Sequence, residues 1–158
     1  MKFTTNTPEE TLKFGYKLGK KLHEGAIISL NGEFGTGKTW LSKGIAFGLD
    51  VPEHEYVNSP AFDLVHEYEG KYPVYHIDFY RLETLSEEDY HWLVEYIDGN
   101  GICLIEWGDK FIDKLIGSYL RIELNHVNFS DKREIIITAR GENYEKLLKE
   151  LNDDSTWN

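Results

Sequence analysis

A glycine-rich segment constrains this chain more than any other part of its sequence. The segment, Gly32-Glu33-Phe34-Gly35-Thr36-Gly37-Lys38-Thr39, matches the Walker A pattern and lies between an apolar run, residues 26–30, and a helix-forming stretch, residues 40–47. Such glycines let main-chain N–H groups curl around a polyphosphate, while the lysine reaches the outer phosphates and the threonine hydroxyl binds Mg²⁺. The sequence therefore predicts a phosphate-binding loop in an α/β fold; a purely structural glycine turn is the alternative.

Length and charge limit the classes of protein that fit. The chain has 158 residues, enough for one domain around one hydrophobic core. We expect a P-loop ATPase domain over residues 1–151 and a flexible C-terminal tail, 152–158. The 28 acidic and 17 basic side chains give a formal net charge of −11. Because a surface of this sign repels phosphodiester backbones, contact with nucleic acid is expected only through a partner.

The lone cysteine and the apolar runs bear on location. Cys103 lies in the apolar run 102–105, which favours a small buried side chain over a nucleophile. No apolar stretch approaches the about 18 residues of a membrane span, and no basic start precedes a hydrophobic signal core. We expect a cytoplasmic protein without a membrane segment.

Helical and extended patterns alternate along the chain. Thr7-Pro8-Glu9-Glu10 predicts a capped helix ending near residue 23, in which Gly15 and Gly19 would permit close approach to a sheet. Residues 49–60 lack periodicity and predict an irregular loop. Further helices are expected at 86–96 and 143–151, hairpins at 61–68 with 73–78 and at 119–124 with 134–139, and a buried strand at 102–106. The expected sheet is mixed, parallel and antiparallel, and flanked by helices.

Two acidic residues are placed to work with the loop. Glu106 follows the most apolar strand, as in a Walker B strand, and Asp78 ends the strand before it. Ligands gather at the carboxyl ends of strands in open α/β sheets. One acid can therefore complete the Mg²⁺ shell begun by Thr39 while the other serves the attacking water. For each acid, a solvated strand end is the alternative.

Neighbouring polar residues have two interpretations each. His76 would share a strand face with Asp78, where a structural hydrogen bond is favoured over acid–base work. Arg81 could neutralise charge as phosphate bonds break, or pair with a nearby acid. The other histidines are scattered without metal-ligand spacing, so no zinc site is predicted.

Four sequence blocks together resemble the bacterial TsaE (YjeE) family. Besides the Walker A loop, they are Ser59-Pro60-Ala61-Phe62 with the residues up to 68, His76-Ile77-Asp78-Phe79-Tyr80-Arg81-Leu82, and Ile105-Glu106-Trp107. The resemblance covers about residues 5–140. It implies a single-domain P-loop NTPase-like fold and an ATPase that acts with TsaB and TsaD in threonylcarbamoyladenosine modification of tRNA. In two departures, Ala61 stands where the family usually has Thr, which weakens a catalytic role for that block, and Gly108 stands where Pro is common.

The resemblance also implies roles for single residues. Lys38 would hold phosphates, Thr39 and Glu106 would bind Mg²⁺, and Asp78 would serve the catalytic water or an apical metal-bound water. The set implied to bind ATP or ADP is Thr7, Glu33, Phe34, Gly35, Thr36, Gly37, Lys38, Thr39, Trp40 and Arg133, with Thr7 and Arg133 near the nucleoside. Trp107 can pack in the core or clamp the nucleotide pocket, and core packing is slightly favoured.

Two functions stay open on this basis. One is an ATPase, slow alone and faster with TsaB and TsaD, whose loop 49–60 orders with nucleotide state. The other is a nucleotide-gated assembly module in which ATP binding matters and hydrolysis does not. A kinase would need an arginine-rich lid and a GTPase an Asn-Lys-x-Asp run, and the sequence has neither. Candidate docking surfaces, or else ordinary surface and core positions, are Lys21, Lys43, Phe79, Tyr80, Tyr90 and Trp92.

Overall fold

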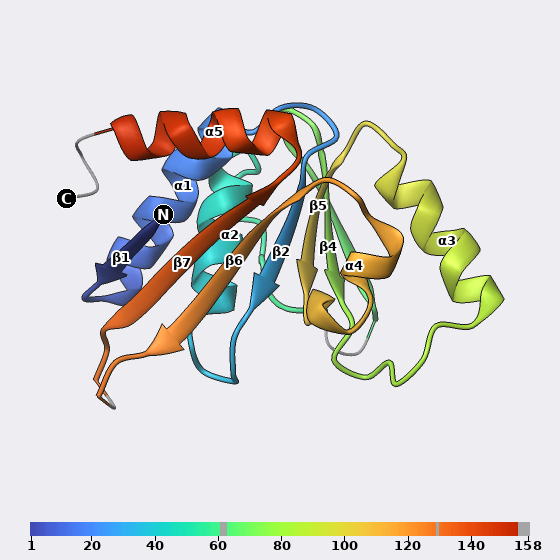
Figure 1. The fold of residues 1–158 in the computed structure, drawn as a ribbon, viewed down its shortest axis with the longest axis horizontal. Helices are drawn as coiled ribbons and strands as arrows, with labels where there is room; N and C mark the ends of the chain where they lie inside the picture. The colour runs from blue at the N-terminus through green and yellow to red at the C-terminus, as the bar shows by residue number, and fades with distance from the viewer. Residues whose placement is uncertain (61–62, 129, 155–158) are drawn as a thin grey trace.

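One mixed sheet organises the chain (Figure 1). In the computed structural model, which describes residues 1–60, 63–128 and 130–154, seven strands pair in the order β1-β7-β6-β2-β5-β4-β3. They are β1 Lys2–Thr5, β2 Ile27–Asn31, β3 Val65–Glu69, β4 Pro73–Asp78, β5 Ile102–Glu106, β6 Tyr119–His126 and β7 Arg133–Arg140. Strand β2 pairs in parallel with β5 and β6, and β4 pairs in parallel with β5, whereas β1–β7, β6–β7 and β3–β4 are antiparallel. The expected mixed α/β sheet is confirmed.

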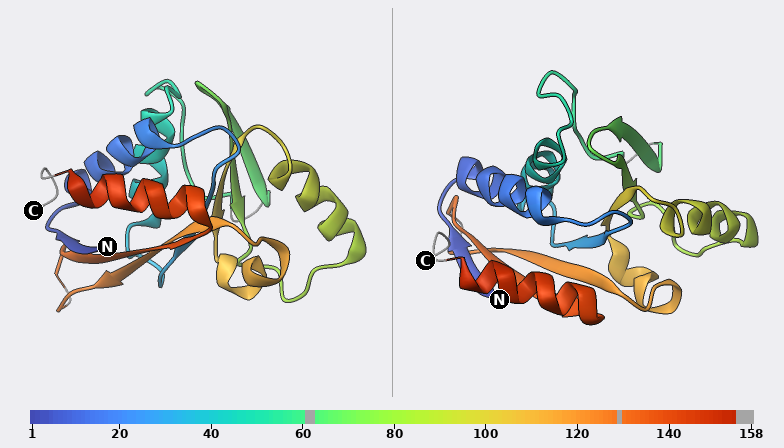
Figure 2. Two further views of the ribbon diagram at one scale, coloured as in Figure 1. Left: turned by 45° about the horizontal axis from the view of Figure 1, so that its top comes forward. Right: turned by 90° about the horizontal axis from the view of Figure 1, so that it is seen from above.

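Helices cover both faces of this sheet. Helices α1 (Pro8–Lys21) and α2 (Lys38–Gly48) lie on one face, and α5 (Glu142–Asp153), α4 (Ile112–Leu115) and α3 (Glu87–Ile97) lie on the other (Figure 2). A short 3-10 helix, η1 (Gly108–Lys110), precedes α4. Every residue of β2 and β5 is buried. This is expected of parallel strands with helices on both faces, and it explains their uninterrupted apolar runs.

The start of α1 is fixed by the residues that predict it. The Thr7 hydroxyl accepts a hydrogen bond from the Glu10 N–H at 3.2 Å, and Pro8 opens the helix. The Glu10 carboxylate in turn accepts from the Asn6 N–H at 2.7 Å. These bonds satisfy main-chain N–H groups that have no partner inside the helix.

The glycines of α1 face helix α2, so the expected approach to a sheet is wrong. A Cβ atom at Gly15 would lie 2.5 Å from the Leu41 carbonyl oxygen, and one at Gly44 would lie 2.1 Å from that of Leu12. Only hydrogen fits between backbones this close. Glycine spacing indicates close approach but not the partner, because a helix and a sheet both offer backbone for it. The contact fixes α2, which begins at Lys38.

Element boundaries differ from expectation at several places. Strand β1 was not expected, because Lys2–Thr5 contains a single large apolar residue and gains its order by pairing with β7. Neither η1 nor α4 was expected. Helix α2 begins at Lys38, two residues earlier than the stretch 40–47. Helix α5 continues to Asp153, so the first two residues assigned to the tail are helical, and residues 155–158 lie outside the described part. Residues 61–62, the start of an expected strand, also lie outside it, whereas 49–60 form the expected irregular loop.

Two further observations concern the cysteine and the expectation about membrane segments. Cys103 is fully buried, as expected, and burial raises the pKa of its thiol to about 12. No helix in the described residues is both long enough and apolar enough to cross a membrane.

Candidate functional site

The carboxyl ends of three parallel strands bring the predicted site together. Strand β2 leads into the Walker A loop, β5 ends at Glu106 and β4 ends at Asp78. The register pairs Asp78 with Glu106, and Leu30 of β2 also pairs with Glu106. Both acids therefore stand on neighbouring strands and on the same face as α2. They are 4% and 2% exposed, so the alternative of solvated strand ends is excluded.

The Walker A loop adopts a conformation that requires glycine. Gly35 and Gly37 have φ values of 76° and 99°, a region that other L-residues rarely adopt. The Thr36 hydroxyl donates to the Glu33 carbonyl at 2.8 Å and closes the loop. Gly37 is the N-cap of α2 and has no side chain to cap it. The first N–H groups of α2 are therefore available to an anion, and the helix dipole favours one there.

Lys38 folds back over its own loop. Its ammonium donates to the carbonyls of Gly32 at 2.5 Å and Glu33 at 3.0 Å, and lies 4.7 Å from the ring centroid of Trp107. Burial lowers the pKa of Lys38, and the nearby carboxylates of Glu106 and Asp78 oppose that shift. The lysine is thus pre-positioned at the loop, with carbonyl partners that phosphate oxygens could replace.

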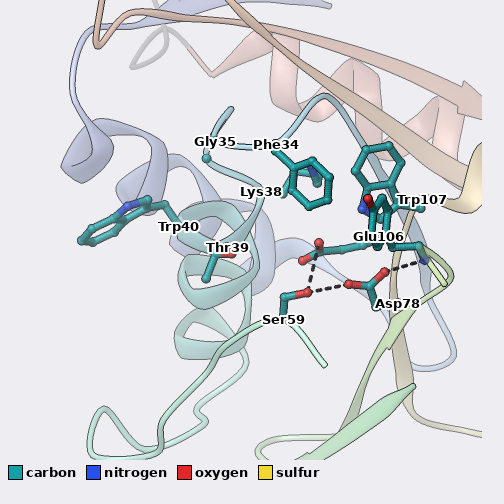
Figure 3. A pocket seen from close by; sticks show the side chains of 11 residues that line it. Phe34, Gly35, Lys38, Thr39, Trp40, Ser59, Asp78, Glu106 and Trp107 are labelled. Atoms are coloured by element: carbon teal, nitrogen blue, oxygen red, sulfur yellow. Dashed lines mark hydrogen bonds between the residues drawn. The ribbon is translucent and has the colours of Figure 1, made fainter. Parts of the chain in front are cut away.

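A hydrogen-bond network holds the two carboxylates (Figure 3). The Ser59 hydroxyl donates to Oδ2 of Asp78 at 2.6 Å and lies 3.5 Å from Oε2 of Glu106. The Tyr80 N–H donates to Oδ1 of Asp78 at 2.8 Å. Nε2 of His76, a fully buried side chain, lies 2.8 Å from Oε1 of Glu106. His76 therefore makes the structural hydrogen bond that the sequence favoured, and it makes that bond to the expected metal ligand.

The Walker A loop, the two carboxylates and Ser59 line one cavity of about 380 Å³ (Figure 3). Eight of its lining residues were predicted: Phe34, Gly35, Gly37, Lys38, Thr39, Trp40, Asp78 and Glu106. Of the other three, Trp107 was one of two alternatives in the sequence analysis, and Ser59 and Tyr80 were not predicted as site residues. Ser59 belongs to an irregular loop without local pattern, although its block contributes to the family resemblance. Arg81 is exposed and does not line the cavity.

Three aromatic rings meet above Lys38, and we call them the aromatic cap. The ring of Phe34 lies 4.7 Å from that of Tyr80 and 5.3 Å from that of Trp107, and the latter two lie 5.1 Å apart. Phe34 is 63% exposed although it is a large apolar side chain. Trp107 has a φ of 57°, a strained value for this residue type. Trp107 also packs against the buried core cluster that contains Ile105 and Ile112, so core packing is confirmed and the clamp interpretation stays open.

A smaller cavity of about 80 Å³ adjoins the loop on the side of β7. Arg133 lines it and donates from Nε to the Thr36 carbonyl at 2.9 Å and from Nη2 to the Gly35 carbonyl at 3.2 Å. Thr36 and Trp40 also line this cavity. Thr7 and Glu33 line neither cavity: Thr7 caps α1, and Glu33 lines a separate cavity of about 260 Å³.

The donor set fits a magnesium ion that arrives with phosphates. Mg²⁺ takes oxygen ligands and commonly binds through one or two protein groups together with phosphate oxygens and waters. The Thr39 hydroxyl and the Glu106 carboxylate line the same cavity and can supply them. Among the described residues, no three His, Cys, Asp or Glu side chains form a metal site by themselves. The protein groups would therefore need the phosphates to complete the coordination shell.

A strand, a glycine loop and a helix beginning Lys-Thr, beside two strands that end in acids, define a P-loop NTPase-like protein. The family model described as "Threonylcarbamoyl adenosine biosynthesis protein TsaE" matches residues 5–135. The chain belongs to the TsaE family.

Two relatives and a solved structure are consistent with this family assignment. The Bacillus subtilis (strain 168) tRNA threonylcarbamoyladenosine biosynthesis protein TsaE is 39% identical over 153 residues, covering 96% of this chain and 94% of the relative. The protein of the same name from Haemophilus influenzae is 34% identical over 146 residues, covering 87% of this chain and 89% of the relative. The crystal structure of Bacillus subtilis YdiB superposes with a TM-score of 0.82 at 35% identity, covering 96% of this chain and 93% of that one.

Proposed function

We propose that this protein binds ATP with Mg²⁺ and hydrolyses it, slowly alone and faster with TsaB and TsaD. Its turnover would serve threonylcarbamoyladenosine modification of the adenosine beside the tRNA anticodon, in the cytoplasm. The observation that carries the proposal is that Lys38, Thr39 and the carboxylates of Asp78 and Glu106 line the same cavity. The pathway rests on the family and on the names of the relatives.

Phosphate binding would use groups that already lie in place. The N–H groups of the loop and of the first turn of α2 can cradle the phosphates. Lys38 would exchange its hydrogen bonds to the Gly32 and Glu33 carbonyls for bonds to phosphate oxygens. Bound Mg²⁺ would neutralise charge on the β- and γ-phosphates. Thr39 and Glu106 are the residues that would hold it.

Asp78 is the group best placed to orient the attacking water. It ends the strand next to Glu106, and the Tyr80 N–H fixes one of its oxygens. Its other oxygen accepts from the Ser59 hydroxyl. A water that replaced this hydroxyl could donate to the same oxygen and be aligned with the γ-phosphate.

The contacts of Lys38 and Asp78 also explain why ATP turnover by the isolated protein should be slow. Lys38 is held by the loop carbonyls, and Asp78 is held by Ser59. Both groups must exchange partners before they can act on ATP. A partner protein that favours the exchanged arrangement would raise turnover. With a net charge of −11, the chain is suited to reach tRNA through such partners and not directly.

Substitution at Asp78 separates hydrolysis from ATP-gated assembly. We expect Asp78→Ala to bind ATP–Mg²⁺ in calorimetry but to lose both ATP turnover and tRNA modification. Modification would be followed by nucleoside mass spectrometry in a reaction reconstituted with TsaB, TsaD and threonylcarbamoyl-adenylate. Glu150→Ala, which removes an exposed acid from α5, is the control. Full modification by the Asp78 variant would favour the assembly module instead.

Two further results would contradict the proposal. Lys38→Ala should abolish the heat of ATP–Mg²⁺ binding, because it removes the cation that reaches the outer phosphates. Absence of that heat in the wild-type chain would exclude nucleotide binding altogether. Equal ATP turnover with and without TsaB and TsaD would exclude partner activation.

A further inference from the structure

A groove separate from the nucleotide cavity is lined by the segment before α3, the first turns of that helix, and α4 with the residue before it. We call it the α3–α4 groove; residues 83–87, 90–91, 111 and 114–115 line it. Its volume is about 750 Å³, and it shares no lining residue with the nucleotide cavity. Leu85, Phe111 and Leu115 form a half-buried apolar floor, and the Tyr90 side chain is 46% exposed at its edge. An accessible aromatic beside apolar pockets is the composition of a protein interface centre.

Acidic side chains dominate the rim of the α3–α4 groove. Glu83 and Glu87 line it, and Glu88 follows Glu87 in the first turn of α3. All three are exposed. Among the described side chains, none of these carboxylates forms an ion pair. Lys114 and His91 lie on the groove as well, so the rim carries both signs with carboxylates in excess. Such a rim complements a basic segment and repels an acidic one.

The two walls of the groove are continuous with the two site acids. From Asp78, the chain passes through Tyr80 of the aromatic cap to Glu83. From Glu106, it passes through Trp107 of the same cap to Phe111 and α4. A partner that displaces either wall would therefore also displace the segment that immediately follows Asp78 or Glu106.

Behind the groove the two walls are joined. The rings of Phe79 and Phe111 lie 5.5 Å apart, edge to face. The Phe79 N–H also donates to the Glu106 carbonyl at 3.1 Å. Phe79 is 1% exposed, so it cannot move without displacing its neighbours. A side chain that enters the groove and packs on Phe111 would thus be in contact, through Phe79, with the backbone of both acids.

We propose that the α3–α4 groove docks a segment of a partner protein carrying apolar side chains flanked by Lys or Arg, and that this docking raises ATP turnover. The inference rests on the proposed function, because it names the surface through which a partner acts. Tyr90 and the apolar floor anchor the apolar side chains, and Glu83 and Glu87 pair with the basic ones. Movement of the walls alters the contacts that Tyr80 and Trp107 make in the nucleotide cavity.

Charge reversal with a matched control tests the groove. The double variant Glu83→Lys/Glu87→Lys and the single variant Tyr90→Ser change the groove without touching the nucleotide cavity. The control, Glu145→Lys/Glu150→Lys on α5, makes the same change in net charge at exposed positions, one of them also in a first helical turn. The measurements are ATP turnover alone, turnover with saturating TsaB–TsaD complex, and affinity for that complex by calorimetry. All variants should keep the basal turnover of the wild type.

We expect both groove variants to lose at least tenfold in affinity for the complex and most of its stimulation, while the control keeps both. If the groove variants bind and respond like the wild type, the groove is not the docking site, although the proposed function stands. If the control loses as much as the double variant and Tyr90→Ser keeps the wild-type affinity, the effect is one of general charge and the groove is likewise excluded. If the wild type itself neither binds nor responds, the proposed function fails and the docking inference falls with it.

A photo-crosslinking residue in place of Tyr90 identifies the chemistry of the occupant. Irradiated with the TsaB–TsaD complex, it should capture a peptide in which apolar residues are flanked by Lys or Arg. Excess Mg²⁺–ATP should alter the yield, because coupling between two sites is reciprocal. Capture of an acidic peptide would overturn the assignment.

Discussion

Replacing Gly44 with alanine tests the closest contact in the fold. The added Cβ atom would lie 2.1 Å from the Leu12 carbonyl oxygen, 2.9 Å from its carbon and 3.0 Å from the Tyr16 nitrogen. All three are backbone atoms, so no side chain can rotate to relieve the clash. Helices α1 and α2 would have to separate by roughly an ångström. The side chains packed beside this contact, among them Leu18 and Ile45, would lose dispersion contacts as they part.

Two effects of opposite sign set the magnitude. Overpacking a well-filled interior costs about 1–3 kcal/mol, and a clash between backbones belongs at the upper end. Alanine in a helix interior is favoured over glycine by about 1 kcal/mol. We therefore expect Gly44→Ala to lower the free energy of unfolding by about 2 kcal/mol. For a domain of this size that corresponds to a fall in Tm of about 4–8 °C.

Urea unfolding followed by circular dichroism measures the effect. Gly117→Ala is the control, because a Cβ atom there meets nothing within 4 Å, and its free energy of unfolding should stay within about 0.5 kcal/mol of the wild type. Calorimetry on the folded Gly44 variant should also show weaker ATP binding, since Lys38 and Thr39 move with α2. A variant more stable than the wild type by the propensity gain alone would refute the reasoning.

Three other substitutions or probes follow from the site and the core. Ser59→Ala should raise the ATP turnover of the isolated protein by up to about tenfold while leaving ATP affinity within twofold, because it removes the charge-assisted hydrogen bond that a water must replace at Asp78. Ser59→Thr, which keeps the hydroxyl, should stay near the wild-type rate, and a loss of turnover in the alanine variant would contradict this role. His76→Phe should lower the free energy of unfolding in urea by about 1–3 kcal/mol, since buried Glu106 loses its hydrogen-bond partner. His76→Gln should recover part of the loss, and equal stability of the two variants would count against this role. Because Cys103 is fully buried and the pKa of its thiol is raised to about 12, a thiol reagent should label the native protein slowly throughout the range from pH 7 to 10, yet should react promptly in urea; fast native labelling would contradict the burial.

Local sequence predicted most of the half of the candidate site that the Walker A loop forms. The Walker A loop is contiguous, and its glycine spacing specifies a backbone shape, so Lys38 and Thr39 could be placed from neighbours alone. Asp78 and Glu106 were also predicted, because acids at the ends of apolar strands gather at one edge of a parallel sheet. Capping signals such as Thr7-Pro8 similarly fixed the start of α1.

The parts that sequence missed depend on contacts distant along the chain. Ser59 reaches Asp78 from an irregular loop, and no periodic pattern marks where such a loop will pass. Strand β1 has little apolar content and is ordered by pairing with β7, at the far end of the chain. The partner of Gly15 was mistaken for a sheet because a missing side chain signals proximity without identifying the neighbour. In each case the deciding energy comes from a tertiary partner.

The orientation of Arg133 limits how it can meet a ligand. Nη1 donates to the carbonyls of Ser130 and Lys132, while Nε and Nη2 donate to those of Thr36 and Gly35. With the edges of the guanidinium engaged in this way, a purine in the adjoining small cavity would meet mainly its flat face. Stacking on a planar cation does not read the substituents that distinguish adenine from guanine. If the proposed nucleotide places its base here, any preference between the two bases would fall to other groups that line this cavity, such as Thr11 and Asp131.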